Sequence, residues 1–229
     1  AFNILGKKKI EDLSDTNILV NLFESKKPDK INPILDGMYA YVVYNKAKNQ
    51  LLITRDPQGE KSLYIYENNE TIIISSEINP IIKFTKDDKI NLNVLKTYFC
   101  SRHFLQFNKT IFNNIRNIEP GILTSLNLNN FKFKTLGKYL MHDHVNEDEF
   151  KINEKRKEED LCAELDFLLK KNLNEMIPVD RSFGSIISGG IDSSLISNYI
   201  SRISNPKKLI SLNHVGKDRI SNRVGDFDR

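Results

Sequence analysis

Hydrophobic and polar positions alternate along much of the first half of the chain. Short apolar runs are separated by turns rich in Asn, Lys and Glu. Alternation of this kind is typical of strands with one buried face, and short polar turns join such strands in antiparallel pairs. The pattern predicts three hairpins, which pair residues 38–44 with 50–54, 63–66 with 71–75, and 121–126 with 131–135.

Other segments show the helical period instead. One predicted helix is capped by Ser14 or Asp15, and a second begins near Asn91 or Asn93. Leucines then recur at helical spacing within residues 154–177, which predicts a long helix in the second half. A leucine stripe of this type is expected to pack in a core.

The second half continues with the order strand, helix, strand. Residues 182–187 and 208–213 are the predicted strands, and residues 195–203 are the predicted helix between them. This order is typical of a parallel α/β sheet. A parallel sheet needs several crossover units to bury both faces, so these elements are expected to be only the beginning of a domain.

The change of pattern divides the chain. The first domain is predicted to be α+β with antiparallel sheets, and the second to be the start of an α/β domain with a parallel sheet. A polar, highly charged linker is expected between them. The predicted boundaries are 1–140 for the first domain, 141–153 for the linker and 154–229 for the second domain.

Composition and charge exclude several classes of protein. Of the 229 residues, 39% are hydrophobic, which is enough for a packed core. The net charge of +4 comes from well-mixed charges without an arginine-rich block, so we expect no nucleic-acid partner. No apolar run has the length that spans a bilayer, so we expect no membrane partner. Cys100 and Cys162 have no CxxC neighbour, which predicts reduced, partly buried thiols in a cytoplasmic protein.

Residues 188–194, with the sequence SGGIDSS, carry the clearest chemical signal. They lie between a predicted strand and a predicted helix, where backbone N–H groups and the helix dipole converge on one point that suits a phosphate. Gly189 and Gly190 allow a close backbone approach, and Asp192 could hold a metal ion or an amide. The segment lacks the Lys of the Walker loop. The alternative is a plain turn in which Asp192 or a serine caps the helix.

Ordered strings in both halves carry a family resemblance. They are SDT at 14–16, LDGMYAY at 35–41, RDPQGEKSLY at 55–64, SSE at 75–77, IEPG at 118–121 and SGGIDSS at 188–194. Together they resemble the glutamine-dependent asparagine synthetase family, as a chain truncated at both ends. The first domain resembles the later part of a class II glutamine amidotransferase domain of the N-terminal-nucleophile hydrolase type. The second resembles the beginning of an asparagine synthase-like ATP pyrophosphatase domain.

The resemblance implies a ligase with two coupled reactions. The first domain would release ammonia from glutamine, and the second would use ATP and Mg²⁺ to activate aspartate as β-aspartyl-AMP, which ammonia attacks. Glutamine, aspartate and ATP are therefore the expected small-molecule partners, and ATP and Mg²⁺ the expected cofactors. The expected location is cytoplasmic, and a homodimer is one option for the oligomeric state.

The resemblance also assigns site residues. Asp15 matches the aspartate that would pair with the α-ammonium group of glutamine, although it could instead cap a helix. Ile187 and Val215 match positions that contact the nucleotide. The residues that match the pyrophosphate loop are Ser188, Gly189, Gly190, Asp192, Ser193 and Ser194. The matches expected to be structural, in a turn after a strand and a buried ion pair, are Arg55, Asp56, Gly59 and Glu77.

Some family features are missing from the chain. Residue 1 is Ala, whereas an N-terminal-nucleophile hydrolase needs its nucleophile there. We therefore assign no catalytic residue, and we expect this chain alone to be inactive. The residues that would bind the metal ion stay unknown. Two other functions stay open. The acceptor could be a sugar or lipopolysaccharide precursor, or the substrate of a β-lactam synthetase-like relative, and the chain could be a non-catalytic scaffold.

Overall fold

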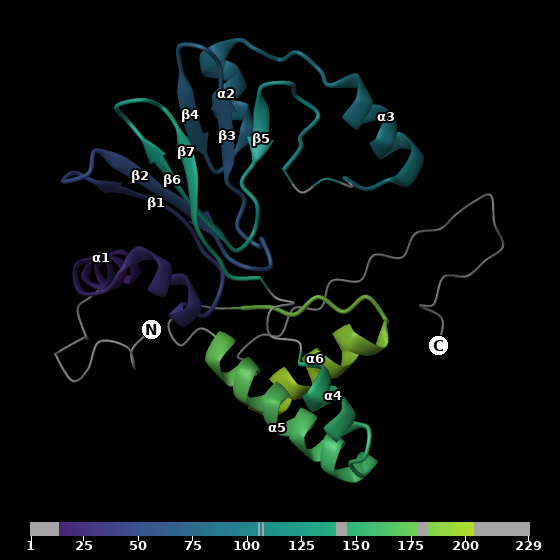
Figure 1. The fold of residues 1–229 in the computed structure, drawn as a ribbon. Coiled ribbons are helices and arrows are strands. Elements are labelled where there is room, and N and C mark those ends of the chain that lie inside the picture. Colours follow the sequence, from purple (N-terminus) through teal and green to yellow (C-terminus); the bar gives the residue numbers. More distant parts are fainter. Residues whose placement is uncertain (1–13, 105, 107, 141–145, 178–182, 204–229) are drawn as a thin grey trace, which may run out of the picture. The chain divides into compact units, whose positions relative to one another are not determined.

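The chain folds into two compact units, residues 1–146 and 147–229, in a computed structural model. The residues that the structure describes are 14–104, 106, 108–140, 146–177 and 183–203. The first unit contains two antiparallel sheets together with helices, which confirms the predicted α+β class of this part (Figure 1).

The larger sheet combines the first and third predicted hairpins. Its strands stand in the order β1-β2-β6-β7, and every neighbouring pair is antiparallel. Their bounds are Ala40–Asn45 for β1, Gln50–Arg55 for β2, Ile122–Asn127 for β6 and Phe133–Lys138 for β7. Both hairpins are confirmed. Asn49, at the end of the first turn, has a φ of 46°, a left-handed conformation that Asn adopts more easily than most residues.

The smaller sheet contains the second predicted hairpin and one strand that was not predicted. Its order is β4-β3-β5, again antiparallel throughout. The bounds are Tyr64–Glu67 for β3, Ile72–Ser75 for β4 and Ile115–Asn117 for β5. In the register, Ile65 lies opposite both Ile74 and Arg116, so β3 is the central strand.

One hydrophobic core joins the two sheets. The Ile118 N–H donates to the Leu63 carbonyl at 2.9 Å, so the chain that leaves β5 is tied to the start of β3. The buried residues of this core come from both sheets and their connections: Ile53, Leu63, Ile65, Ile118 and Leu126. Burial of each such side chain contributes about 1.5–3 kcal/mol, so this cluster stabilises the packing of one sheet on the other.

The first unit has three α-helices and two short 3-10 turns in its described part. They are α1 (Asp15–Ser25), η1 (Pro28–Lys30), η2 (Asn32–Ile34), α2 (Ile78–Thr85) and α3 (Leu92–Ser101). The two predicted helices, α1 and α3, are confirmed. Ser14 caps α1 by accepting a hydrogen bond from the Asn17 N–H at 3.3 Å, and Asn91 caps α3. α1 packs through Ile18 and Leu22, which are buried with Ile31.

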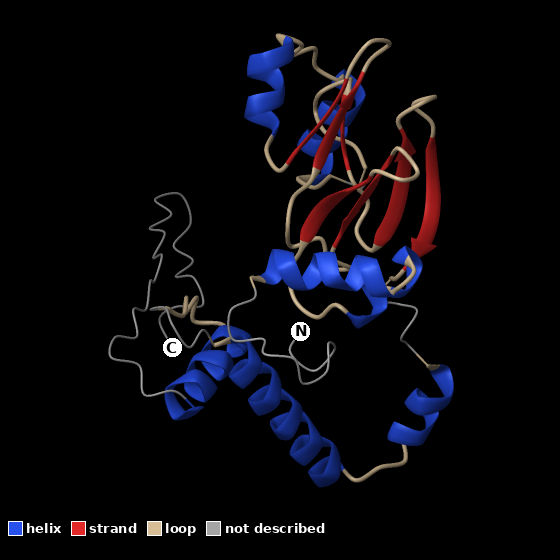
Figure 2. Ribbon diagram, turned by 90° about the vertical axis from the view of Figure 1, so that its left-hand side faces the viewer, coloured by secondary structure: helices blue, strands red, loops and turns tan. Residues whose placement is uncertain are grey.

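The second unit is helical in its described part. Its helices are α4 (Glu147–Asn153), α5 (Glu158–Met176) and α6 (Ile191–Ile203), shown in blue in Figure 2. α5 confirms the predicted long helix, and α4 occupies the second half of the predicted linker. No helix among the described residues of either unit is long and apolar enough to cross a membrane.

Two predictions about this unit are wrong for the described residues. α5 has no buried residue, and Leu165 is 55% exposed, because only one face of α5 packs against α6. The described part of the predicted strand at 182–187 is irregular, since no described strand lies beside it to pair with its backbone groups. The second predicted strand, 208–213, lies outside the described residues. The described residues therefore do not show the predicted start of a parallel sheet.

The cysteines differ from the prediction in exposure. Cys100 lies on α3 and Cys162 on α5, and both are exposed rather than partly buried. Both helices lack buried residues in the described structure, so a thiol on either is uncovered. Both are free thiols.

Candidate functional site

The predicted phosphate turn lies directly before α6. Gly189 has a φ of 85°, a conformation that costs other residues about 1–2 kcal/mol. The Ser194 N–H donates to the Gly190 carbonyl at 3.2 Å, which is the first hydrogen bond of the helical type in α6. α6 therefore begins earlier than the predicted residue 195, and the serines and Asp192 form its first turn.

Ser193 holds the turn in shape. Its Oγ donates to the Gly190 carbonyl at 3.1 Å and accepts from the Ser188 N–H at 3.2 Å. The Ser188 and Ser193 hydroxyls are also 3.1 Å apart. A serine has one proton to donate, so Ser193 gives its proton to Gly190 and must accept from the Ser188 hydroxyl. Both hydroxyls are thus engaged within the turn in this conformation.

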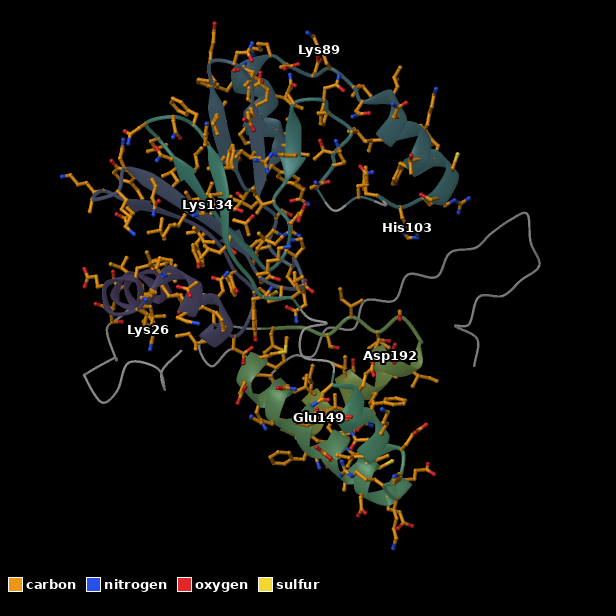
Figure 3. The ribbon with its side chains drawn as sticks, viewed as in Figure 1. Lys26, Lys89, His103, Lys134, Glu149 and Asp192 are labelled. Atoms are coloured by element: carbon orange, nitrogen blue, oxygen red, sulfur yellow. The ribbon has the colours of Figure 1, made fainter. Side chains whose placement is uncertain are left out.

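The groups left to receive an anion come from the first helical turn. The backbone N–H groups of Ile191, Asp192 and Ser193 lie in the first turn of α6. They have no intrahelical partner, because a carbonyl four residues earlier would lie before the helix begins. The exposed Ser194 adds a hydroxyl donor. Asp192 is exposed at the start of α6, where Figure 3 labels it. This arrangement can bind a phosphate through backbone donors and leaves one carboxylate free at its edge.

The other predicted nucleotide contacts lie at different places. Ile187 directly precedes the turn and is half-buried. Val215 lies outside the described residues. The described residues include no group of three or more His, Cys, Asp or Glu side chains that could hold a metal ion by themselves. A Mg²⁺ ion here would therefore need ligand phosphates beside Asp192, which is how Mg²⁺ is commonly held at nucleotides.

A polar contact attaches α6 to α5. The Tyr199 hydroxyl donates to Asp166 Oδ1 at 2.6 Å, and Lys170 Nζ donates to Asp166 Oδ2 at 2.6 Å. The hydrogen bond from Lys170, followed by that from Tyr199, lowers the pKa of Asp166 below its usual value. The ionised carboxylate thus bridges the two helices and orients α6 within its unit.

Asp15 is the predicted contact for glutamine. It is the first residue of α1 and is exposed, while Ser14 serves as the N-cap. Among the described residues no group hydrogen-bonds the Asp15 carboxylate. The capping alternative is therefore taken by Ser14, and Asp15 is left with a carboxylate that can pair with an ammonium group. Its place in the first turn also suits a negative charge.

Arg55 and Asp56 form a node between the sheets. Arg55 is 6% exposed and donates from Nη2 to the Gly59 carbonyl at 2.7 Å and from Nη1 to Asn117 Oδ1 at 2.6 Å. Burial disfavours the ionised form of Asp56, but hydrogen bonds from backbone N–H groups outweigh it and lower its pKa. The turn after the strand is as predicted. The predicted buried ion pair is not seen among the described residues, because Arg55 and Asp56 have separate hydrogen-bonding partners and Glu77 is exposed.

A buried polar chain beneath α1 was missed. The Tyr41 hydroxyl donates to Asn32 Oδ1 at 2.5 Å, and Asn32 Nδ2 donates to Thr54 Oγ1 at 2.9 Å. Burial, with the neighbouring Tyr39, raises the pKa of Tyr41, so its phenol stays neutral. Phe23 of α1 packs edge-on against the Tyr41 ring at 5.7 Å. Tyr41 and Thr54 lie opposite each other in the first predicted hairpin, on the same face of the sheet. This shared face is the sequence signal that could have indicated a contact between their hydroxyl groups.

Residues 5–139 match the family of glutamine amidotransferase domains. The chain belongs to this family. It is 29% identical over 187 residues to asparagine synthetase [glutamine-hydrolyzing] 1 of Bacillus subtilis, which covers 80% of the chain and 27% of the relative. It is also 29% identical over 203 residues to a probable asparagine synthetase [glutamine-hydrolyzing] of Dictyostelium discoideum, with 86% and 29% covered. These relatives confirm the predicted resemblance to the glutamine-dependent asparagine synthetase family.

The reach of these similarities differs along the chain. The present chain aligns with the solved structure of glutamine phosphoribosylpyrophosphate amidotransferase from Bacillus subtilis. The identity is 17% and the TM-score 0.37, over 89% of the present chain and 41% of the solved one. The alignment with the Dictyostelium discoideum relative covers 86% of the chain. The uncovered 14% is shorter than the segment from Ser194 to Arg229, even if all of it lies at the C-terminal end. That alignment therefore includes the turn before α6. The chain spans between a quarter and a third of the length of both asparagine synthetases.

Proposed function

We propose that the full-length protein is a glutamine-dependent ligase that converts aspartate into asparagine. Its amidotransferase unit would release ammonia from glutamine, and its second unit would activate the aspartate side chain with ATP. One observation carries the proposal. A phosphate-type turn opens α6 in a chain whose residues 5–139 are a glutamine amidotransferase domain.

The proposed reaction needs a good leaving group on the aspartate carboxyl. A β-carboxylate oxygen attacks the α-phosphorus of ATP, and the bond to the pyrophosphate breaks to give β-aspartyl-AMP and pyrophosphate. The nitrogen of ammonia then attacks the activated carbonyl carbon, AMP leaves with the bonding electron pair, and a proton is lost from nitrogen. Charge develops on the departing pyrophosphate in the first step, so fixed donors at that point would lower the barrier.

Each part of the turn has a task in this proposal. The N–H groups of Ile191, Asp192 and Ser193 would receive pyrophosphate oxygens, together with the Ser194 hydroxyl. Asp192 would hold Mg²⁺, which supplies positive charge against the phosphates. Ser188 and Ser193 would keep the turn in its binding shape, and Gly189 would let the backbone come close. Ile187 and Val215 would contact the nucleotide.

Asp15 has a separate task in the amidotransferase unit. Its exposed carboxylate at the start of α1 would pair with the α-ammonium group of glutamine. An ammonium–carboxylate pair of this kind selects an amino acid over a simple amide. The two units would thus recognise different substrates through different carboxylates.

Pyrophosphate release by the full-length protein tests the function. We expect release from ATP that depends on aspartate together with glutamine or ammonia. Asp192→Ala should abolish this release and leave glutamine hydrolysis largely intact, because Asp192 lies outside the amidotransferase unit. Glu149→Ala is the matched control, since it removes an exposed acid from α4 of the same unit. Unchanged pyrophosphate release in Asp192→Ala would refute the assignment of the turn.

The identity of the acceptor is settled by product analysis. The same protein is incubated with ATP, glutamine and either aspartate or an amino-sugar precursor, and the amide product is identified by mass spectrometry. Asparagine is the expected product. An amidated sugar or a cyclised product would move the function to one of the relatives, and no product with any acceptor would favour a non-catalytic scaffold.

A further inference from the structure

A second pair of serines lies beneath the phosphate turn. Ser185 Oγ and Ser197 Oγ are 2.5 Å apart, and the two residues are only 8% and 5% exposed. They are the buried polar residues in the described part of the second unit. A hydrogen bond screened from water in this way resists competition better than one at the surface.

The bond closes the chain around the turn. Ser185 lies three residues before Ser188, in the segment that leads into the turn, and Ser197 lies within α6. Ile200, the other buried residue of α6, lies one helical turn beyond Ser197 on the same face. The segment that enters the turn and the helix that leaves it are thus joined on the buried side of α6.

The contacts inside the turn differ from this bond in exposure. The bonds among Ser188, Gly190 and Ser193 are exposed, so water competes for each of these groups. The hydroxyls of Ser185 and Ser197 are covered, so they can act on a ligand only through the position of the backbone that they hold. A displacement of about 1 Å at a binding site is enough to cost a large factor in rate.

We propose that Ser185 and Ser197 are a positioning pair that sets the spacing between Ser188 and the first turn of α6, and so sets the affinity for the triphosphate of ATP. The proposal rests on the proposed function of the turn. It assigns a task to two residues that lie outside the family strings quoted above, of which SGGIDSS at 188–194 is the nearest. Neither hydroxyl would touch the nucleotide, because both residues are buried.

The test removes both hydroxyls at once. Replacing both partners of a buried hydrogen bond by apolar groups disturbs stability much less than replacing one, so the full-length Ser185→Ala/Ser197→Ala variant is expected to fold. Loss of the bond should raise the KM for ATP about five- to tenfold, the factor that one hydrogen bond supplies. The kcat for glutamine hydrolysis should not change. Amide hydrogen exchange within residues 188–194 should become faster without any nucleotide present.

The control and the outcomes separate the two proposals. Ser201→Ala removes an exposed hydroxyl from the same helix and should leave both the KM for ATP and the exchange rates unchanged. Wild-type exchange and wild-type KM in the double variant would overturn the positioning pair while leaving the ATP reaction in place. A wild-type protein that releases no pyrophosphate would instead refute the proposed function. In that case unchanged exchange in the double variant would also refute the positioning role, and faster exchange would support it.

Discussion

Gly59→Ala should be one of the most destabilising small substitutions in the amidotransferase unit. Gly59 has a φ of 73°, so alanine would adopt a disfavoured left-handed conformation. The new Cβ would overlap Arg55 Nη2 and would lie 2.9 Å from Pro120 Cγ. The Arg55 guanidinium would have to move, although it bonds the Gly59 carbonyl and Asn117 Oδ1.

The magnitude follows from these two effects. The backbone conformation costs about 1–2 kcal/mol for a residue with a Cβ. Each hydrogen bond of a charged group contributes about 1.5–3 kcal/mol, and at least one from Arg55 would be lost. We therefore expect a loss of about 3–5 kcal/mol in the free energy of unfolding. That is a large part of the 5–15 kcal/mol typical of a folded protein.

Urea unfolding of the full-length protein measures the loss. Amide hydrogen exchange at β2 and β5 reads the transition of the amidotransferase unit separately from the rest. Gly137→Ala is the matched control, because Gly137 lacks a positive φ and its Cβ would meet its nearest neighbour, Asp29 Cβ, at 3.8 Å. That control should change stability by less than about 1 kcal/mol. A Gly59→Ala loss equally small would refute the role of the Arg55 node.

Two further predictions concern carboxylates in the same unit. Ser14→Ala should cost about 1 kcal/mol of stability through the lost cap, whereas Asp15→Asn should leave stability nearly unchanged and raise the KM for glutamine in steady-state assays; the reverse pattern would make Asp15 the cap. Because the folded-state pKa of Asp56 is lowered, its contribution is present above the unfolded value of about 3.9 and is lost as the pH falls through the folded value. The difference between the urea midpoints at pH 7 and pH 3 should therefore be smaller in Asp56→Asn than in the wild-type protein. A difference as large as in the wild type would contradict this.

Local pattern was sufficient for the hairpins, because each strand finds its partner across a short turn. It was not sufficient for the pairing of β2 with β6, which brings Leu52 opposite Ser125. Alternation tells which face of a strand is buried but not which strand lies beside it. β5, at Ile115–Asn117, is too short to show alternation at all.

The second unit shows a different limit of sequence patterns. The leucine spacing correctly predicted the helix α5 but not its burial, because burial depends on what covers the helix. In the described structure α6 is the element that packs most extensively against it. The predicted start of α6 at residue 195 was late, since serine and aspartate are residues that also favour turns and caps. The structure shows that Asp192 already belongs to the helix.

Adjacent identical residues in the turn carry different constraints. Ser193 has its single proton committed to Gly190 and also accepts from Ser188, while Ser194 is exposed at the start of the same helix. In a saturation mutagenesis library, position 193 should therefore tolerate few residues beyond threonine even when selection is only for folding of the turn. Position 194 should be permissive under that selection and become restrictive only when growth depends on the ATP reaction. Two neighbouring serines would thus report separately on the shape of the turn and on its use.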